Sequence, residues 1–263
     1  MMLGRVYRTL IPESFRQAVR RQLFIRNIVK DLRKIRNLQY AKQVLSVLEG
    51  RFPRHCPICG FEGYFMAKSI PMKTDAHCPS CNSVGKHRQL WQVIAQRDSI
   101  SAESRLLHFA PEDCLSTRLK TMVAEYTTAD FMRNDVDLKL DIENIDLPSG
   151  SIDVVICNHV LEHVQHHKAL SELYRIMAKG GRAFLTIPIV WEWENTYEDE
   201  SVLDEGGREL HFGQFDHRRI FGQDFVTAVR AAGFEVREHT ALGAECVAYG
   251  LLPGEKIFVA HKP

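Results

Sequence analysis

The segment of residues 152–187 constrains the fold more than any other part of the chain. It contains a buried strand at 152–157, an amphipathic helix at 166–177, a Gly-Gly pair and a second buried strand at 182–187. Short apolar runs on either side of a helical period are typical of a strand, a crossover helix and a parallel strand. The sequence therefore predicts a parallel sheet that helices cover on both faces.

The rest of the second half of the chain continues the alternation of strands and helices. Strands are expected at 105–109, 126–129, 235–239 and 256–260, and helices at 115–124 and 222–232. This order predicts an α/β fold with a doubly wound, mostly parallel sheet. Ligands of such sheets bind at the carboxyl ends of the strands. Polar residues that directly follow a strand are therefore the candidates for a functional site.

Length and composition set the outer limits. With 263 residues, of which 45% are hydrophobic, the chain can bury one substantial core and carry an appendage. It has no run of about 18 uncharged apolar residues and no signal-peptide pattern at its start. We therefore expect neither membrane spanning nor secretion, and we expect the protein in the cytoplasm.

Residues 1–50 form a basic segment with apolar residues at helical spacing. They hold 11 Lys+Arg against 3 Asp+Glu, which gives +8, whereas the whole chain carries +1. We expect a basic helical arm. It could cover apolar surface of the main domain, bind an anionic membrane at its inner face, or contact nucleic acid. The scarcity of aromatic residues makes nucleic acid the weakest of these alternatives.

Residues 51–85 contain two Cys-x-x-Cys turns, Cys56 with Cys59 and Cys78 with Cys81. The 18 residues between the turns give the spacing of a zinc ribbon, in which four thiolates complete a tetrahedral shell. A full shell leaves no open position, so we expect a structural Zn²⁺ ion. A redox pair and an iron site are the alternatives.

Two stretches carry a family resemblance. The residues LPSGSIDVVICNHVLEHV (147–164) and MAKGGRAFLTIP (177–188) closely resemble the class I S-adenosylmethionine-dependent methyltransferases of type 11. A subset of bacterial methyltransferases that pairs a four-cysteine knuckle with an H-F/Y-A-P-E turn, here His108 to Glu112, is similar over 52–263. The resemblance implies a seven-stranded, Rossmann-like methyltransferase domain over 86–263 and S-adenosylmethionine as its cofactor.

The same resemblance implies where that cofactor binds. Asp130 would hold the ribose hydroxyls, although it could instead cap the next element. Asp141 and Ile142 would contact the adenine ring, although turn chemistry could also explain Asp141. Asn158 and His159 would lie beside the methyl group. The full set of expected cofactor residues is Phe109, Ala110, Pro111, Glu112, Asp130, Phe131, Asp141, Ile142, Asn158 and His159.

The first loop departs from the family pattern. His108 stands at the usual acidic position, and Ala110 and Glu112 stand where glycines are expected. A loop without glycine approaches a ligand less closely. We expect Glu112 to direct its carboxylate toward the amino group of the cofactor's methionyl part.

Residues 188–224 are too long and polar for a passive connection, so we expect a lid over the active site. Their aromatic residues favour a glycan-like acceptor, and their acidic run disfavours nucleic acid. The expected stacking residues are Trp191, Trp193, Tyr197, Phe212 and Phe215. The resembling subset also carries a G-Q-x-D-H-x-R run, here 213–219, which could either pin the lid or serve catalysis.

A histidine is the expected base for an alcohol acceptor. His217 supported by Asp216 is the first candidate, followed by His159 and His211. His159, Glu162 and His163 also spell the H-x-x-E-H pattern of some zinc proteases. That interpretation is disfavoured because the pattern follows a buried strand and does not lie within a long helix. Lys86, His87 and Arg88 are expected on the solvated surface.

Three functions follow from these features. The leading hypothesis is O-methylation of a small or glycan-like acceptor by an S-adenosylmethionine-dependent enzyme. The second is methylation of an rRNA or tRNA base, since a zinc knuckle also precedes this fold in some ribosomal RNA enzymes. The third is a binding module that has lost catalysis through its altered first loop. The acceptor's identity and the oligomeric state stay open.

Overall fold

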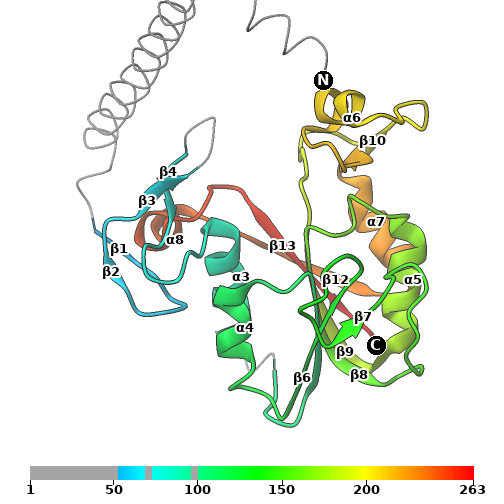
Figure 1. Ribbon diagram of the computed structural model, residues 1–263, viewed down its shortest axis with the longest axis horizontal. Helices are drawn as coiled ribbons and strands as arrows, with labels where there is room; N and C mark the ends of the chain where they lie inside the picture. Colours follow the sequence, from blue (N-terminus) through cyan, green and yellow to red (C-terminus); the bar gives the residue numbers. More distant parts are fainter. Residues whose placement is uncertain (1–52, 69–72, 96–99) are drawn as a thin grey trace, which may run out of the picture.

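The computed structural model describes residues 53–68, 73–95 and 100–263, so the predicted basic arm lies outside the described residues. The predicted doubly wound sheet is confirmed: seven strands lie in the order β12-β13-β9-β8-β5-β6-β7 (Figure 1). The strands β5 to β9 are parallel, and β13 runs antiparallel to both of its neighbours. Their bounds are β5 (Arg105–Phe109), β6 (Glu125–Asp130), β7 (Leu138–Lys139), β8 (Ile152–Asn158), β9 (Met177–Thr186), β12 (Glu235–Thr240) and β13 (Lys256–His261).

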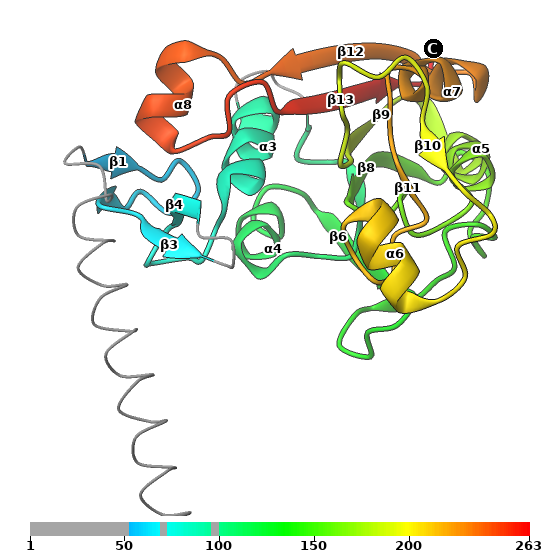
Figure 2. The same cartoon turned by 90° about the horizontal axis from the view of Figure 1, so that it is seen from above.

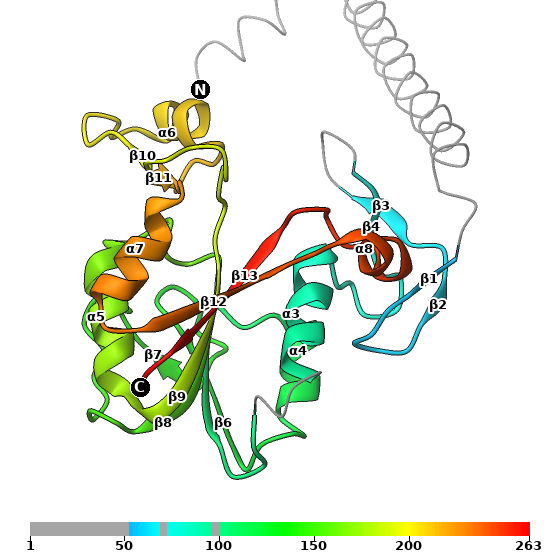
Figure 3. The same cartoon turned by 180° about the vertical axis from the view of Figure 1, so that it is seen from behind.

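Helices cover the two faces of this sheet. The helices α3 (Gly85–Ala95) and α4 (Asp113–Leu119) lie on one face, and α5 (His166–Ile176) and α7 (Asp224–Ala231) lie on the other (Figure 3). Consecutive strand residues alternate between the faces, because side chains in a strand point to opposite sides. Leu106 and Val154 pack toward α3 and α4, whereas Leu107 and Val155 pack toward α5 and α7. The sheet therefore separates two apolar cores.

The cysteine-rich segment forms two short hairpins beside the sheet. β1 (Arg54–His55) pairs with β2 (Glu62–Gly63), and β3 (Met66–Lys68) pairs with β4 (Lys73–His77). The helix α8 (Gly243–Tyr249), which the sequence did not predict, lies next to them (Figure 2). The buried residues Cys56, Ile58, Phe65 and Cys78 share one apolar cluster with α3 and the sheet. The cysteine-rich segment and the sheet are thus packed around a common core.

Arg88 joins these parts, and its expected place on the solvated surface is wrong. The side chain is fully buried. Its guanidinium donates to the carbonyl oxygens of Ser83, Tyr249 and Gly250, and it lies 4.4 Å above the ring of Phe65. Because the five N–H donors of arginine point in fixed directions, one side chain can hold the ribbon, α3 and α8 together.

The predicted lid segment contains its own small elements. β10 (Tyr197–Glu198) pairs with β11 (Arg219–Ile220), and α6 (Glu205–Phe212) lies between them in sequence. The side chain of Arg219 is almost fully buried and binds Glu198 on β10, with an Nε to Oε2 distance of 2.9 Å. It also donates to the carbonyl oxygens of Leu161 and Val164. Arg219 therefore fastens the lid to the turn that follows β8.

Within the described ranges, we found no helix of the length and apolar character that a membrane crossing requires.

Candidate active site

One cavity of about 670 Å³ lies at the carboxyl ends of β5, β6 and β8. That is where Rossmann-like sheets bind their ligands, and the volume suits a small organic molecule. Asp216, Arg208 and Arg218 of the lid also line it. Seven of the ten expected cofactor residues line this cavity, namely Phe109, Ala110, Asp130, Phe131, Asp141, Ile142 and His159.

Two residues at the strand ends adopt the left-handed backbone conformation that usually requires glycine. Ala110, directly after β5, has φ +48°, and His159, directly after β8, has φ +52°. Such conformations cost on the order of 1 kcal/mol for residues with a Cβ atom, and they cluster at functional sites. At Ala110 the first loop therefore adopts the backbone conformation that a glycine would usually supply, although the loop contains no glycine.

Asp130 serves the turn that follows β6 and still offers a free oxygen. Its Oδ1 accepts hydrogen bonds from the backbone N–H groups of Met132 and Arg133 at 2.7 and 2.8 Å. No described residue donates to its Oδ2 atom. Phe131 is 62% exposed at the rim of the cavity, and Ile142 is buried in its wall. A carboxylate oxygen and two apolar surfaces thus face the same space.

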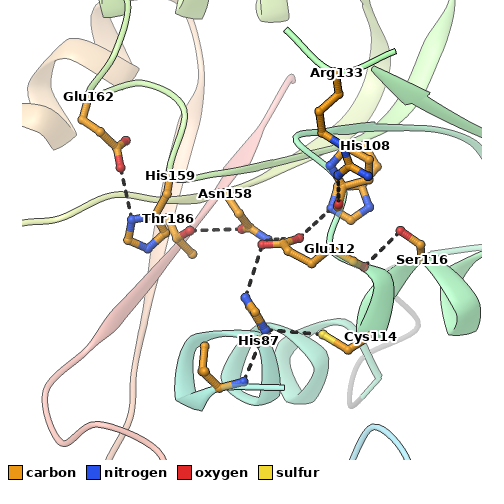
Figure 4. Close-up of polar contacts among 12 residues, drawn as sticks. His87, His108, Glu112, Cys114, Ser116, Arg133, Asn158, His159, Glu162 and Thr186 are labelled. Atoms are coloured by element: carbon orange, nitrogen blue, oxygen red, sulfur yellow. Dashed lines mark hydrogen bonds and ion pairs between the residues drawn. The ribbon is translucent and has the colours of Figure 1, made fainter. Parts of the chain in front are cut away.

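Glu112 does not line the cavity, which differs from the expectation that it faces the cofactor. Its Oε2 lies 3.0 Å from Nε2 of the buried His108, and its Oε1 lies 3.5 Å from Nε2 of His87 (Figure 4). The Asn158 amide donates to both carboxylate oxygens at 3.3 Å. Asn158 also lies outside the cavity lining, as does Pro111, whose carbonyl oxygen accepts from Arg133. Glu112 therefore links α3, β5 and β8 and is not part of the cavity lining.

Burial and hydrogen bonding act in opposite directions on Glu112. Burial by itself raises the pKa of this carboxyl, but the hydrogen bond and the charge of His108 and the charge of His87 outweigh it, so the pKa is lowered. Burial lowers the pKa of His87 to about 4, although Glu112 opposes this effect. At neutral pH His87 is therefore an uncharged imidazole, and because its Nδ1 accepts from the N–H of Val84, the proton lies on Nε2, which faces Glu112 at 3.5 Å.

A second polar cluster borders the cavity beside β8. Nδ1 of His159 lies 3.1 Å from Oε1 of Glu162, whose side chain is fully buried (Figure 4). Nε2 of His159 and Oε2 of Glu162 are buried, and neither has a hydrogen-bond partner among the described residues. The rings of His163 and His217 meet edge to face, with 4.9 Å between their centroids.

The predicted pairing of Asp216 with His217 is wrong in the structure. Asp216 instead faces His163, whose Nδ1 lies 3.2 Å from its carbonyl oxygen and 3.4 Å from its Oδ2. Nδ1 of His217 lies 3.2 Å from the carbonyl oxygen of Phe212. Burial lowers the pKa of His217. Its imidazole is therefore held by the backbone, and burial disfavours its charged form.

Other lid residues lie away from the cavity. His211 stacks against Tyr197, and its Nδ1 lies 2.6 Å from the tyrosine hydroxyl. Phe212 is buried, and Trp191 lies 3.9 Å beneath Nζ of Lys256. Trp193, Tyr197 and Phe215 are exposed, but none of the five aromatic residues lines the cavity. The structure thus does not bring the expected stacking faces to this site.

The four cysteines of the ribbon meet at one point. Their sulfur atoms all lie within 4.8 Å of one another, and the distances Cys56–Cys81 and Cys59–Cys78 are each 3.6 Å. A tetrahedral zinc ion with bonds of about 2.3 Å separates its sulfur ligands by about 3.8 Å. Gly60 and Asn82 adopt left-handed conformations that turn the chain after each pair. The donor set and its geometry fit Zn²⁺.

Sequence reasoning missed several residues of the site. Arg208 and Arg218 line the cavity, and His163 contributes to both the cavity and the histidine cluster. The H-x-x-E-H spacing was a usable signal, because it placed His159, Glu162 and His163 within one turn after β8. The contribution of the arginines depends on how the lid folds, which no local pattern reveals.

Comparison with known proteins agrees with this architecture. Residues 107–185 match the family model of a methyltransferase domain. No match was found among the curated proteins. The solved structure of the [4+2]-cyclase SpnF is 15% identical, with a TM-score of 0.51, over 69% of this chain and 84% of the other.

An S-adenosylmethionine-dependent methyltransferase from Mesorhizobium loti is 13% identical, with a TM-score of 0.48, over 66% of this chain and 98% of the other. The strand order, the cavity at the strand ends and the matched segment agree on one architecture. The chain therefore has the Rossmann-like methyltransferase fold, and its residues 107–185 are the part that matches a methyltransferase domain.

Proposed function

We propose that the protein is an S-adenosylmethionine-dependent methyltransferase that acts on a hydroxyl group of a small or glycan-like acceptor. The observation that carries this proposal is the convergence of Ala110, Asp130, Ile142 and His159 on one cavity. These residues come from different strand ends, far apart in sequence. The match of 107–185 to a methyltransferase domain supports the same reaction class.

The cavity residues fit the parts of the cofactor. Oδ2 of Asp130 is free to accept a hydrogen bond from a ribose hydroxyl. Ile142 and Phe131 offer apolar surface to the adenine ring, with Asp141 beside them. Ala110, with its positive φ and small side chain, lines the cavity without the bulk of a larger residue. When bound, S-adenosylmethionine supplies an electrophilic methyl group on a sulfonium sulfur.

The acceptor hydroxyl must lose a proton, and the histidine beside β8 can take it. Oε1 of Glu162 accepts from Nδ1 of His159, which fixes the tautomer in which Nε2 holds a lone pair. That Nε2 has no partner among the described residues. His159, the second candidate base from the sequence, is therefore better supported than His217 with Asp216.

The lid side of the cavity favours an acceptor that carries an acidic group. Arg208 and Arg218 line both this cavity and a neighbouring one of about 400 Å³. Nε of Arg208 is buried without a hydrogen-bond partner in the described ranges. Guanidinium groups bind carboxylates and phosphates in a bidentate manner. An acidic sugar or a phosphorylated small molecule would satisfy both arginines.

The cysteine cluster is proposed to hold a structural Zn²⁺ ion. The fully buried Arg88 lies close to it and binds only neutral acceptors otherwise, namely carbonyl oxygens and the hydroxyl of Ser83. A zinc ion with four thiolates carries a net charge of about −2. It would therefore supply the negative charge that a buried guanidinium needs.

Calorimetry with S-adenosylmethionine and S-adenosylhomocysteine tests the first proposal. We expect binding to the wild type and binding weakened about tenfold or more by Asp130→Asn, because a hydrogen bond to a charged group is worth about 1.5–3 kcal/mol. Asp130→Asn keeps the Oδ1 acceptor of the turn, so a loss would not reflect unfolding. The matched control is Asp146→Asn on the exposed surface. No heat from the wild type would reject cofactor binding and leave the non-catalytic module.

Transfer of a radiolabelled methyl group identifies the acceptor class. Acidic sugars, neutral sugars and bulk RNA are offered in parallel to the same protein. Labelling of the acidic sugars, lost in Arg218→Gln, supports the proposal. Labelling of RNA alone, unaffected by that change, would establish the base methyltransferase instead.

A further inference from the structure

Glu162, His163 and His217 form a cluster that none of the described interactions explains. One ligand atom from each side chain lies within 4.8 Å of the others. Glu162 and His163 come from the turn after β8, whereas His217 comes from the lid. Two elements that are separate in sequence thus bring a carboxylate and two imidazoles together.

In each of the three side chains, a hydrogen bond holds one polar atom and leaves the other available. Oε1 of Glu162 binds Nδ1 of His159, and Oε2 stays unpartnered although the side chain is fully buried. Nδ1 of His163 lies 3.2 Å from the carbonyl oxygen of Asp216. Nδ1 of His217 lies 3.2 Å from the carbonyl oxygen of Phe212.

This arrangement is that of metal ligands with their supporting partners. A histidine that binds a metal usually donates its other N–H to a carbonyl or carboxylate, which fixes the ring and aims the free nitrogen. A buried carboxylate oxygen without any donor is costly unless a cation or donor completes it. Oε2 of Glu162 therefore requires a donor or a cation, and a cation bound there would have a nitrogen of His163 and of His217 close by.

We propose that Glu162, His163 and His217 bind a divalent transition-metal ion at the edge of the proposed cofactor cavity. Two imidazoles and one carboxylate suit ions such as Mn²⁺, Fe²⁺, Co²⁺ and Zn²⁺. Three protein ligands leave coordination positions open, in contrast to the closed cysteine cluster. His163 also lines the cavity, so an ion held there would be close to a ligand of that cavity.

Such a site would orient an acceptor and make its hydroxyl more acidic, which deepens the proposed function and rests on it. Oxygen atoms of the acceptor would fill the open positions, and a bound cation lowers the pKa of a hydroxyl that it contacts. His217 would then be a ligand and could not also take the proton. His159 keeps that task, and Glu162 connects the two groups through its two oxygens.

The experiment uses full-length protein whose cysteine cluster has first been filled with Zn²⁺. Mn²⁺ is then titrated and followed by electron paramagnetic resonance and calorimetry, since thiolate sites favour Zn²⁺ and do not compete well for Mn²⁺. The variants are Glu162→Gln and His217→Asn, and the control is His211→Gln in the same lid. Far-ultraviolet circular dichroism of each variant shows whether it is folded.

We expect one Mn²⁺ ion per wild-type chain and at least about tenfold weaker binding in both variants, because even the loss of a supporting partner costs 10–100-fold. His211→Gln should bind as the wild type does. Absence of Mn²⁺ binding to the wild type, or unchanged binding in folded Glu162→Gln, would overturn the site. S-adenosylhomocysteine binding, measured on the same samples, reports separately on the proposed function: if it persists without Mn²⁺ binding, only the metal site is rejected.

Discussion

Nε2 of His108 lies 3.0 Å from Oε2 of Glu112. This contact fixes the first loop through two side chains that do not line the cavity. Nδ1 of the same ring lies 2.9 Å from the hydroxyl of Tyr126, which itself donates to Ser116. Because the Tyr126 hydroxyl already donates its proton to Ser116, it can only accept at its contact with His108, so Nδ1 of His108 is the donor there. Burial raises the pKa of Glu112, but the hydrogen bond and the charge of His108 outweigh it, so the pKa of this carboxyl is lowered and its charged form is favoured.

Replacement of Glu112 should therefore affect stability more than cofactor contact. Glu112→Gln keeps the shape but places an amide among three donors, from His87, His108 and Asn158. We expect the free energy of unfolding to fall by about 1–3 kcal/mol, the cost of losing hydrogen bonds to a buried charged group. Urea denaturation measures the change, with the exposed Asp113→Asn as the control. An unchanged midpoint would show that the network contributes little.

The low pKa of His87 predicts a specific dependence of stability on pH. Burial lowers its pKa from 6.5 to about 4 in the native state, and burial has the same effect on His166. The unfolded imidazoles take up protons below pH 6.5 that the native ones refuse, so stability is lost as the pH falls from 6.5 to about 4. Each histidine contributes a slope of up to about 1.4 kcal/mol per pH unit.

His87→Gln should remove one of these two contributions. Between pH 6.5 and pH 4 the slope of the free energy of unfolding against pH should be smaller than in the wild type by up to about 1.4 kcal/mol per pH unit, the contribution of one proton. The control is His261→Gln, at a partly exposed histidine on β13, and it should keep the wild-type slope. Equal slopes in wild type and His87→Gln would mean that His87 is protonated in the native protein.

Removal of the proposed zinc ion should unfold more than the ribbon. Cys56 and Cys78 share their apolar cluster with Phe184 of β9 and Ile257 of β13. We expect Cys59→Ser to lose the metal and several kcal/mol of stability, because structural zinc contributes directly to folding energy. Atomic emission should count one zinc per chain fewer in Cys59→Ser than in the wild type, whereas Cys246→Ala should keep the wild-type zinc content. Wild-type stability in metal-free protein would contradict the assignment.

Arg219 should control the order of the lid. Arg219→Met removes a buried cation that binds the partly exposed Glu198 and two backbone carbonyls, and we expect a loss of about 1–3 kcal/mol from the buried carbonyl groups that lose their donor. Arg219→Lys should recover only part, since an ammonium lacks the fork geometry. Hydrogen exchange of 159–165 and 196–221 measures the effect. Unchanged protection in Arg219→Met would show that other contacts hold the lid.

The sequence predicted the central strands β5 and β8 well because each is a short, mostly apolar and buried run between polar turns. β5 begins and ends where expected, and β8 differs from expectation by one residue. The helix α8 was missed because its seven residues start with a glycine and carry no clear apolar period. β7 was missed because two residues cannot show an alternation.

The candidate site was only partly predictable for a related reason. Asp130 and His159 were found because they follow predicted strands, and Asp141 was found through the family resemblance. The directions of Glu112 and Asp216 depend on partners elsewhere in the chain, His87 and His163, which no local pattern connects. Arg88 was misjudged because a charged residue at a helix start is usually solvated.

The core that the cysteine-rich segment shares with the sheet determines which fragments of this protein can fold on their own. The segment 107–185, which matches the methyltransferase domain, is not self-sufficient, because Val154, Ile156 and Phe184 share an apolar cluster with side chains of α3 and the cysteine-rich segment. A fragment with those boundaries would expose the apolar face of the sheet that α3 and the cysteine-rich segment cover, and we expect it to aggregate. A fragment meant for crystallisation should therefore start ahead of Cys56 and extend through β13.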